Sequence, residues 1–357
     1  MYFLKKSLLV LIFFAGVACV AAQEAEKKHP YRLTKLALDA RVDFDYRNYS
    51  DTTPSKFGFA GKYIDFMLDG HLTEKFTYHY RQRLNIAEAS FSSFYRGCDW
   101  LYLQYRISPN FSVEAGKQCI YIGGIEYDLA PIDVYFGSDF WENITCYEVG
   151  ASASYYSTNE NHQLTFQVCN SPFVSKPFEG LLAYNLIWYG KMGVFSTIYS
   201  VNMIEYEKGK YINYIALGNQ FNINSLMFYV DFINRATSKQ VFLFSDFSVI
   251  GEIKYTIKNR VSIFGKGGYD VNHAQSADIN PSAYFDRCVL PGTEYSFAGL
   301  GTEFFPIKDS QAVRLHAFFA VQNNKSALTT YQANLGLTWN VDLLKVRKRK
   351  PRNKDIK

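Results

Sequence analysis

One stretch near the end of the chain, residues 331–341, restricts the fold more than any other part of the sequence. Its odd-numbered residues are apolar or aromatic, and the residues between them are polar or glycine. Side chains on a β-strand alternate between two faces, so this pattern predicts a strand with one apolar and one polar face. A strand that crosses a membrane needs about 9–11 residues, whereas a soluble strand usually has about 5–6. The segment therefore has the length and the period of a membrane-spanning strand.

The same alternation recurs along the chain. In residues 36–46, Leu, Ala, Val, Phe and Tyr occupy one face, and Asp and Arg occupy the other. We count roughly sixteen segments of this kind. Those near 181–188, 194–204 and 294–305 alternate less cleanly.

The connections between these segments fall into two length classes. Short ones are expected near 74–75, 108–110, 157–162, 189–193, 222–224, 258–260 and 306–311. Longer ones are expected near 47–57, 86–97, 118–146, 170–180, 205–210, 234–241, 271–293 and 322–329. Tight turns at one end and longer loops at the other are typical of a membrane barrel. We therefore predict a mainly β fold, a transmembrane antiparallel up-and-down β-barrel of about sixteen strands. A soluble all-β propeller or sandwich array is the alternative, but it accounts less well for the strand lengths and the two loop classes together.

The N-terminus has the features of an export signal. Lys5 and Lys6 precede an apolar run at 7–18, and small residues follow up to Ala22, where we expect cleavage. Lipidation of Cys19 is an alternative. We predict three parts: a signal peptide at 1–22, a barrel domain at 23–344 and a basic periplasmic tail at 345–357.

Net charge, motifs and composition exclude several classes of function. The net charge of +5 consists of +2 from the signal, +7 from the tail and −4 from the body between them, so nucleic-acid binding is not expected. No HExxH or GxSxG motif occurs, and we predict neither enzyme activity nor a cofactor or metal. Aromatic residues make up 17% of the chain, as aromatic girdles at membrane interfaces would require. Cys119 and Cys146 flank the longest loop, and a disulfide between them is one alternative to free thiols.

That loop, 118–146, combines many apolar residues with five carboxylates and has no Lys, Arg or His. A loop surrounded by solvent has no need of so many Ile, Tyr, Phe and Trp residues. We therefore expect it to pack into the mouth of the barrel.

Three stretches carry a family resemblance: Ser112–Gln118, Gly123–Glu126 and Tyr147–Ala153. With the signal and the final aromatic strand, they resemble Gram-negative outer-membrane porins, most of all the phosphate-selective porin O and P family. The resemblance implies an outer-membrane, water-filled channel for passive diffusion of small hydrophilic solutes or ions. It also implies an inward-folded third extracellular loop, here 118–146, contact with outer-membrane lipid and lipopolysaccharide, and a homotrimer. The alternative function is a surface receptor or binding protein built on a barrel with a plugged lumen.

The polar face supplies candidates for the pore lining. An anion filter needs Lys or Arg facing the lumen, but here both signs of charge occur on that face, so phosphate selectivity is not predicted. Our hypothesis is a transverse field, in which loop carboxylates oppose arginines of the wall; the alternative is that these charges pair and stiffen the wall. The candidates are Arg81, Arg83, Arg106, Glu126, Asp128, Asp133 and Asp139.

Overall fold

The computed structural model describes residues 32–85, 95–173, 179–236, 245–273, 286, 288–308, 310–325 and 328–344. The predicted signal peptide and basic tail lie outside these residues. Within them, no helix is both long and apolar enough to cross a membrane.

Sixteen strands make up nearly all of the regular structure, as predicted. Their bounds are β1 Arg32–Tyr49, β2 Lys56–His71, β3 Phe76–Arg83, β4 Cys98–Ser108, β5 Phe111–Cys119, β6 Tyr147–Tyr156, β7 His162–Asn170, β8 Leu182–Met192, β9 Phe195–Glu207, β10 Lys210–Ile223, β11 Leu226–Ala236, β12 Phe247–Ile257, β13 Val261–Val271, β14 Glu294–Phe304, β15 Val313–Asn324 and β16 Thr330–Asp342.

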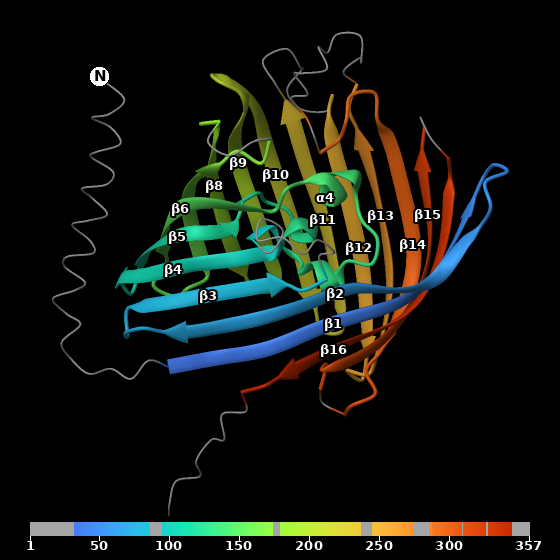
Figure 1. Ribbon diagram of the computed structural model, residues 1–357, viewed down its shortest axis with the longest axis horizontal. Helices are drawn as coiled ribbons and strands as arrows, with labels where there is room; N and C mark the ends of the chain where they lie inside the picture. Colours follow the sequence, from blue (N-terminus) through green and yellow to red (C-terminus); the bar gives the residue numbers. More distant parts are fainter. Residues whose placement is uncertain are drawn as a thin grey trace, which may run out of the picture.

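Each strand pairs antiparallel with its neighbours in sequence, and the ring closes between β1 and β16 (Figure 1). The closing register runs from Ala37 opposite Asp342 to Tyr49 opposite Thr330. A closed ring leaves no strand edge with unpaired N–H and C=O groups, which is the condition for a sheet to exist in lipid. The predicted closed barrel is confirmed.

The two faces of the wall have reversed polarity compared with a soluble protein. Outward-facing apolar residues are exposed, with Leu300 at 71% and Leu335 at 61%. Inward-facing polar residues are buried, with Asp231 and Arg235 both at 0%. Soluble proteins bury apolar residues and leave charged ones exposed. The outer surface therefore suits a hydrocarbon surrounding.

The alternation of short and long connections fails at two places: the predicted short connection at 305–312 has more residues than the predicted longer one at 325–329, and a second difference lies between β9 and β10. The segment predicted as a longer loop at 205–210 is a two-residue turn, Lys208–Gly209, between β9 and β10. Gly209 has φ 75°, a left-handed conformation that glycine adopts readily. Lys210 forms an ion pair with Glu207 at 2.7 Å across this turn. The charged residues that looked like a loop therefore belong to strand ends.

The inward face of β8–β13 is more apolar than predicted. Ile187, Ile204, Ile212 and Ile250 are fully buried there, and they belong to one apolar cluster with residues of the segment 120–146. Strands that are apolar on both faces lose their alternation. This explains why the segments near 181–188 and 194–204 alternated poorly.

Candidate functional site

The connection between β5 and β6, residues 120–146, is the main feature of the barrel interior. It contains three short helices, α3 (Ile125–Asp128), η1 (Pro131–Asp133) and α4 (Asp139–Asn143) (Figure 1). Near its start, Gly123 N donates to Ser200 Oγ of β9 at 2.7 Å, and further on Arg41 of β1 donates to the carbonyl of Val134 at 2.9 Å. In a ring of sixteen, β9 and β1 stand opposite one another. The segment therefore makes contact with both sides of the ring.

The helix α3 is held to the wall through its backbone N–H groups. Asp231 of β11 accepts hydrogen bonds from Ile125 N and from Glu126 N, both at 2.7 Å. A Cβ on Gly218 of β10 would lie 2.8 Å from the Cα of Gly124. Gly124 itself has φ 113°. Glycine at both positions lets the two backbones touch while one carboxylate satisfies two helix-terminal N–H groups.

A buried ion pair fixes the middle of the segment. Lys266 Nζ of β13 lies 2.7 Å from Glu126 Oε1 and donates to the carbonyl of Phe136 at 2.8 Å. Ser138 Oγ donates to the other oxygen of Glu126 at 2.6 Å. Both charged side chains are 4% exposed or less. A pair this well hydrogen-bonded satisfies charges that would otherwise be costly to bury.

Tyr135 lies among two arginines and a histidine of the wall, Arg41 on β1 and Arg314 and His316 on β15. The Arg41 guanidinium lies 4.8 Å from its ring centroid, that of Arg314 5.5 Å, and the His316 ring stacks at 4.4 Å. Its hydroxyl donates to Glu303 Oε1 at 2.8 Å. Cation–π contacts of this kind gain strength where water is excluded.

A second connection packs against α4. The Arg235 guanidinium of β11 pairs with Asp286 at 2.8 Å, with both side chains fully buried. Asp286 accepts from the backbone N–H groups of Cys288 and Val289 at 3.0 and 3.1 Å, and Asn143 donates to the carbonyl of Cys288 at 3.0 Å. Together with the apolar cluster, these contacts fill the side of the interior that faces β8–β13.

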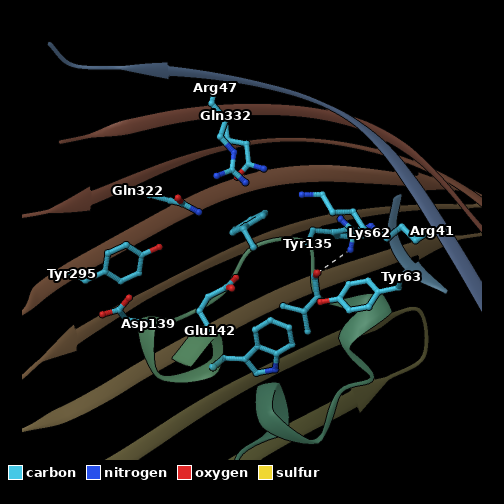
Figure 2. Close-up of a pocket in the computed structure, with 13 residues that line it drawn as sticks. Arg41, Arg47, Lys62, Tyr63, Tyr135, Asp139, Glu142, Tyr295, Gln322 and Gln332 are labelled. Atoms are coloured by element: carbon cyan, nitrogen blue, oxygen red, sulfur yellow. Dashed lines mark hydrogen bonds between the residues drawn. The ribbon is translucent and has the colours of Figure 1, made fainter. Parts of the chain in front are cut away.

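The side centred on β1–β5 contains two adjoining cavities; residues of β14–β16, β1 and β2 line the first, and residues of β2–β6 line the second. The first, of about 340 Å³, is lined by Arg47 and Lys62 from the wall and by Asp139 and Glu142 from α4 (Figure 2). The second, of about 410 Å³, has Arg83, Arg96 and Lys117 in its lining. Both cavities share three residues, namely Tyr63, Trp141 and Glu142.

Opposite charges face each other across the first cavity. Glu142 lies on the loop side and Arg47 on the strand side, as Figure 2 shows. Glu142 is exposed to the cavity, but partial desolvation by the surrounding protein raises its pKa, and the nearby Glu126 carboxylate raises it further. Burial also raises the pKa of Asp139. Lys62 is paired with Asp45 at 2.7 Å, whereas no ion pair of Arg47 is found among the described residues.

The partners of the loop carboxylates differ from the hypothesis. Glu126 pairs with Lys266, and Asp133 pairs with Arg314 at 2.7 Å. Asp128 accepts from Tyr189 Oη at 3.5 Å, and Asp139 faces the first cavity. None of these four forms an ion pair with Arg81, Arg83 or Arg106 among the described residues. Glu126 and Asp133 therefore have other ionic partners, and a field between the loop carboxylates and the three arginines stays a hypothesis.

The three arginines have other positions. Arg81 pairs with Asp65 at 2.6 Å, and Arg83 pairs with Asp99 at 2.8 Å and lines the second cavity. Arg106 lies by the short β4–β5 turn, where it lies 3.8 Å from Glu160. Arg106 is therefore remote from the loop carboxylates.

Sequence reasoning missed Arg47 and Lys62 as lining residues. Arg47 has the same parity as Arg41 in the first strand, so alternation alone was sufficient to place it on the polar face. Cys119 and Cys146 are both free thiols. Among the described residues, no group of three or more His, Cys, Asp or Glu side chains is placed to hold a metal ion.

Comparison with known proteins extends these observations. The family model for phosphate-selective porin O and P matches residues 35–225. No curated protein matched the sequence. The chain is also similar in fold to solved structures, among them these three. An anion-selective porin from Comamonas acidovorans has a TM-score of 0.62 and 11% identity, over 87% of this chain and 100% of that one.

The other two are also outer-membrane proteins. The outer-membrane channel DcaP of Acinetobacter baumannii has a TM-score of 0.60 and 12% identity, over 88% of this chain and 99% of that one. OmpT of Vibrio cholerae has a TM-score of 0.57 and 9% identity, with the same coverage of 88% and 99%. OmpT has also been described in a trimer form, with a TM-score of 0.52. At these identities the likeness concerns the fold.

Proposed function

Because this chain belongs to the phosphate-selective porin O and P family, we infer that it is an outer-membrane channel for the passive diffusion of small hydrophilic solutes. The closed sixteen-stranded barrel agrees with this role, since a barrel of this size leaves an aqueous channel where a barrel of eight strands does not.

We propose that residues 120–146 are an inward-folded third extracellular loop that narrows the channel. The observation that carries the proposal is the reach of its contacts, from Ser200 on β9 to Arg41 on β1. Solutes then pass on the β1–β5 side, where the two adjoining cavities lie.

We further propose that a transverse field acts at this narrowing, with different members from those predicted. Glu142 and Asp139 form the acidic side, and Arg47 and Lys62 form the basic side. Such a field favours polar solutes that align their dipoles and hinders apolar ones. The charges that pair, Glu126 with Lys266 and Asp133 with Arg314, support the alternative of stiffening for that part of the segment.

Conductance in planar lipid bilayers tests the proposal. The purified protein should give ohmic single-channel steps, and Glu142→Gln should shift the reversal potential in a KCl gradient toward that of chloride. Thr302→Val, on the outward side of β14, serves as the control and should leave the reversal potential unchanged. Silence in the bilayer would favour the alternative, a surface receptor or binding protein with a plugged lumen.

Enzyme activity, the terminal segments, lipid contact and the oligomeric state remain predictions or proposals. Absence of enzyme activity stays a prediction, as do the signal peptide at 1–22 and the tail at 345–357. Contact with lipid and lipopolysaccharide is proposed from the exposed apolar outer face. A homotrimer is proposed by analogy with the OmpT trimer form and is checked by native mass spectrometry in detergent.

A further inference from the structure

A third cavity, of about 160 Å³, lies beneath the loop and differs in chemistry from the other two. Its lining includes the aromatic residues Trp100, Tyr102, Tyr121, Tyr127 and Tyr189. Asp128 is its one charged residue, and no Lys or Arg takes part in the lining. The lining combines Tyr189 near the end of β8 with Trp100 near the start of β4 and Gln118 near the end of β5.

The carboxylate of Asp128 is available to a ligand. Its one hydrogen bond among the described residues is from Tyr189 Oη at a long 3.5 Å, and no cation pairs with it there. Asp128 is exposed, so a solute in the lumen can reach its carboxylate, and partial desolvation by the surrounding protein raises its pKa. A carboxylate in such a site gains from accepting further hydrogen bonds.

A hydrogen-bond donor in the same lining also lacks a partner. Gln118 is 2% exposed, and its amide Nε2 is buried with no hydrogen-bond partner among the described residues. Its Oε1 accepts from Ser152 Oγ at 3.4 Å. Buried polar groups are nearly always paired, so an unpaired one in a cavity wall indicates a missing ligand or solvent partner.

These groups together select one class of ligand. Aromatic faces pack against an apolar C–H surface, an unpaired amide donates, and a carboxylate accepts. A pyranose ring offers C–H groups on its faces and hydroxyl groups, which both donate and accept, at its edge. An organic cation would satisfy Asp128 and the aromatic rings, but it would leave the amide donor of Gln118 unpaired.

We propose that this cavity is a saccharide subsite, which holds one neutral sugar ring of a solute passing through the channel. The inference rests on the proposed channel function and names a solute class for it. The sugar stacks on Trp100 and Tyr102, and its hydroxyls bond to Asp128 and Gln118. The cavity has room for about one ring, so longer saccharides would extend along the lumen.

Sugar-dependent block of the ion current in planar bilayers tests the subsite. Glucose added on either side should reduce the current through the wild-type protein in a saturable way. Trp100→Ala should raise the half-blocking glucose concentration by about tenfold or more, because it removes a stacking face. Trp100→Phe keeps an aromatic face and should restore most of the block. Trp339→Ala, on the outward side of β16, is the matched control and should not change it.

A second probe separates the sugar from a cation. Tetramethylammonium should block less effectively than glucose, and Asp128→Asn should weaken glucose block several-fold without abolishing it, since an amide still accepts. Block by tetramethylammonium alone, lost in Asp128→Asn, would overturn the proposal in favour of a cation site. Normal conductance with no block by glucose would also overturn it while leaving the channel function intact. Absence of conductance in the wild-type protein would instead refute the channel function itself.

Discussion

The two sides of the barrel interior differ in packing, although both are built from alternating strands: one side is filled by the loop, and the other lines cavities. On the β8–β13 side, inward residues such as Ile212 and Tyr214 are fully buried against the loop. Asp231, Arg235 and Lys266 are buried there and are hydrogen-bonded or ion-paired. On the β1–β5 side, Arg47, Lys62 and Glu142 line open cavities. The first wall packs closely against the loop, and the second lines the cavities through which we propose that solutes pass. The contrast shows that inward position alone does not make a residue a pore-lining residue.

Two ion pairs with the same separation allow the contrast to be measured. Lys266 and Glu126 lie 2.7 Å apart, with side chains 4% and 2% exposed. Lys62 and Asp45 also lie 2.7 Å apart, but they are 29% and 14% exposed. Lys266→Met should lower the free energy of unfolding by about 3–5 kcal/mol, because it leaves a buried carboxylate unpaired. Lys62→Met should lower it by less than about 1 kcal/mol.

Urea unfolding of the protein in lipid vesicles, followed by tryptophan fluorescence, gives both values. The double variant Glu126→Met with Lys266→Met is the control, since removal of both charges should recover most of the loss. Equal effects of Lys266→Met and Lys62→Met would contradict the division of the interior into a filled and an open side.

A smaller effect on stability is expected from a methyl group at Gly218, where the backbone of β10 touches the loop backbone at Gly124. Gly218→Ala should destabilise the barrel by about 1–3 kcal/mol, because its Cβ would lie 2.8 Å from Gly124 Cα and 2.9 Å from Ile125 N. At Gly251, on the outward face, the nearest atom would be 3.4 Å away, so Gly251→Ala should have little effect. The same unfolding assay compares the two. Loss of the same size in both would mean that strand propensity, and not the loop contact, sets the cost.

The smallest effect is a pH dependence confined to the open side. Partial desolvation by the surrounding protein raises the pKa of Glu142, so this carboxyl group becomes neutral at a higher pH than a glutamate in free solution, which titrates near about 4.3. Below its pKa the acidic side of the field weakens while Arg47 stays charged. As pH falls from neutral into the mildly acidic range, anion preference should therefore increase by a few millivolts of reversal potential.

Reversal potentials measured between pH 7 and pH 4 in wild type and Glu142→Gln check this expectation. The variant should start with the higher anion preference and change less over the range. Parallel titration curves for the two proteins would show that another group is responsible.

The strand framework could be predicted from the sequence, because alternation and loop length are local properties. Residues 331–341 and 36–46 lie on paired strands, as their patterns required. The charge partners could not be predicted in the same way. Lys266 follows Glu126, and Arg314 follows Asp133, by well over a hundred residues in the chain. Which wall position meets which loop residue depends on closure of the ring and on the path of the loop, and neither is encoded in local spacing.

The turn at Lys208–Gly209 teaches a related lesson. The cluster of charged residues from Glu205 to Lys210 looked like a longer loop, but they end two strands of 13 and 14 residues. The apolar inner face of β8–β13 was also not predicted, although the sequence of two of these strands showed weak alternation. A strand pattern that fails to alternate was a signal that both faces carry apolar residues.

The pairing of β1 with β16 has a consequence for the making of this protein. The strand that closes the ring is among the last parts of the described chain to be synthesised, and its partner is among the first. Any product that stops before Thr330 keeps two strands with open edges, and such edges are prone to aggregate. The barrel can therefore close after export of the strand at Thr330–Asp342 and not before. Closure of the ring therefore requires that the chain has been synthesised and exported through this strand.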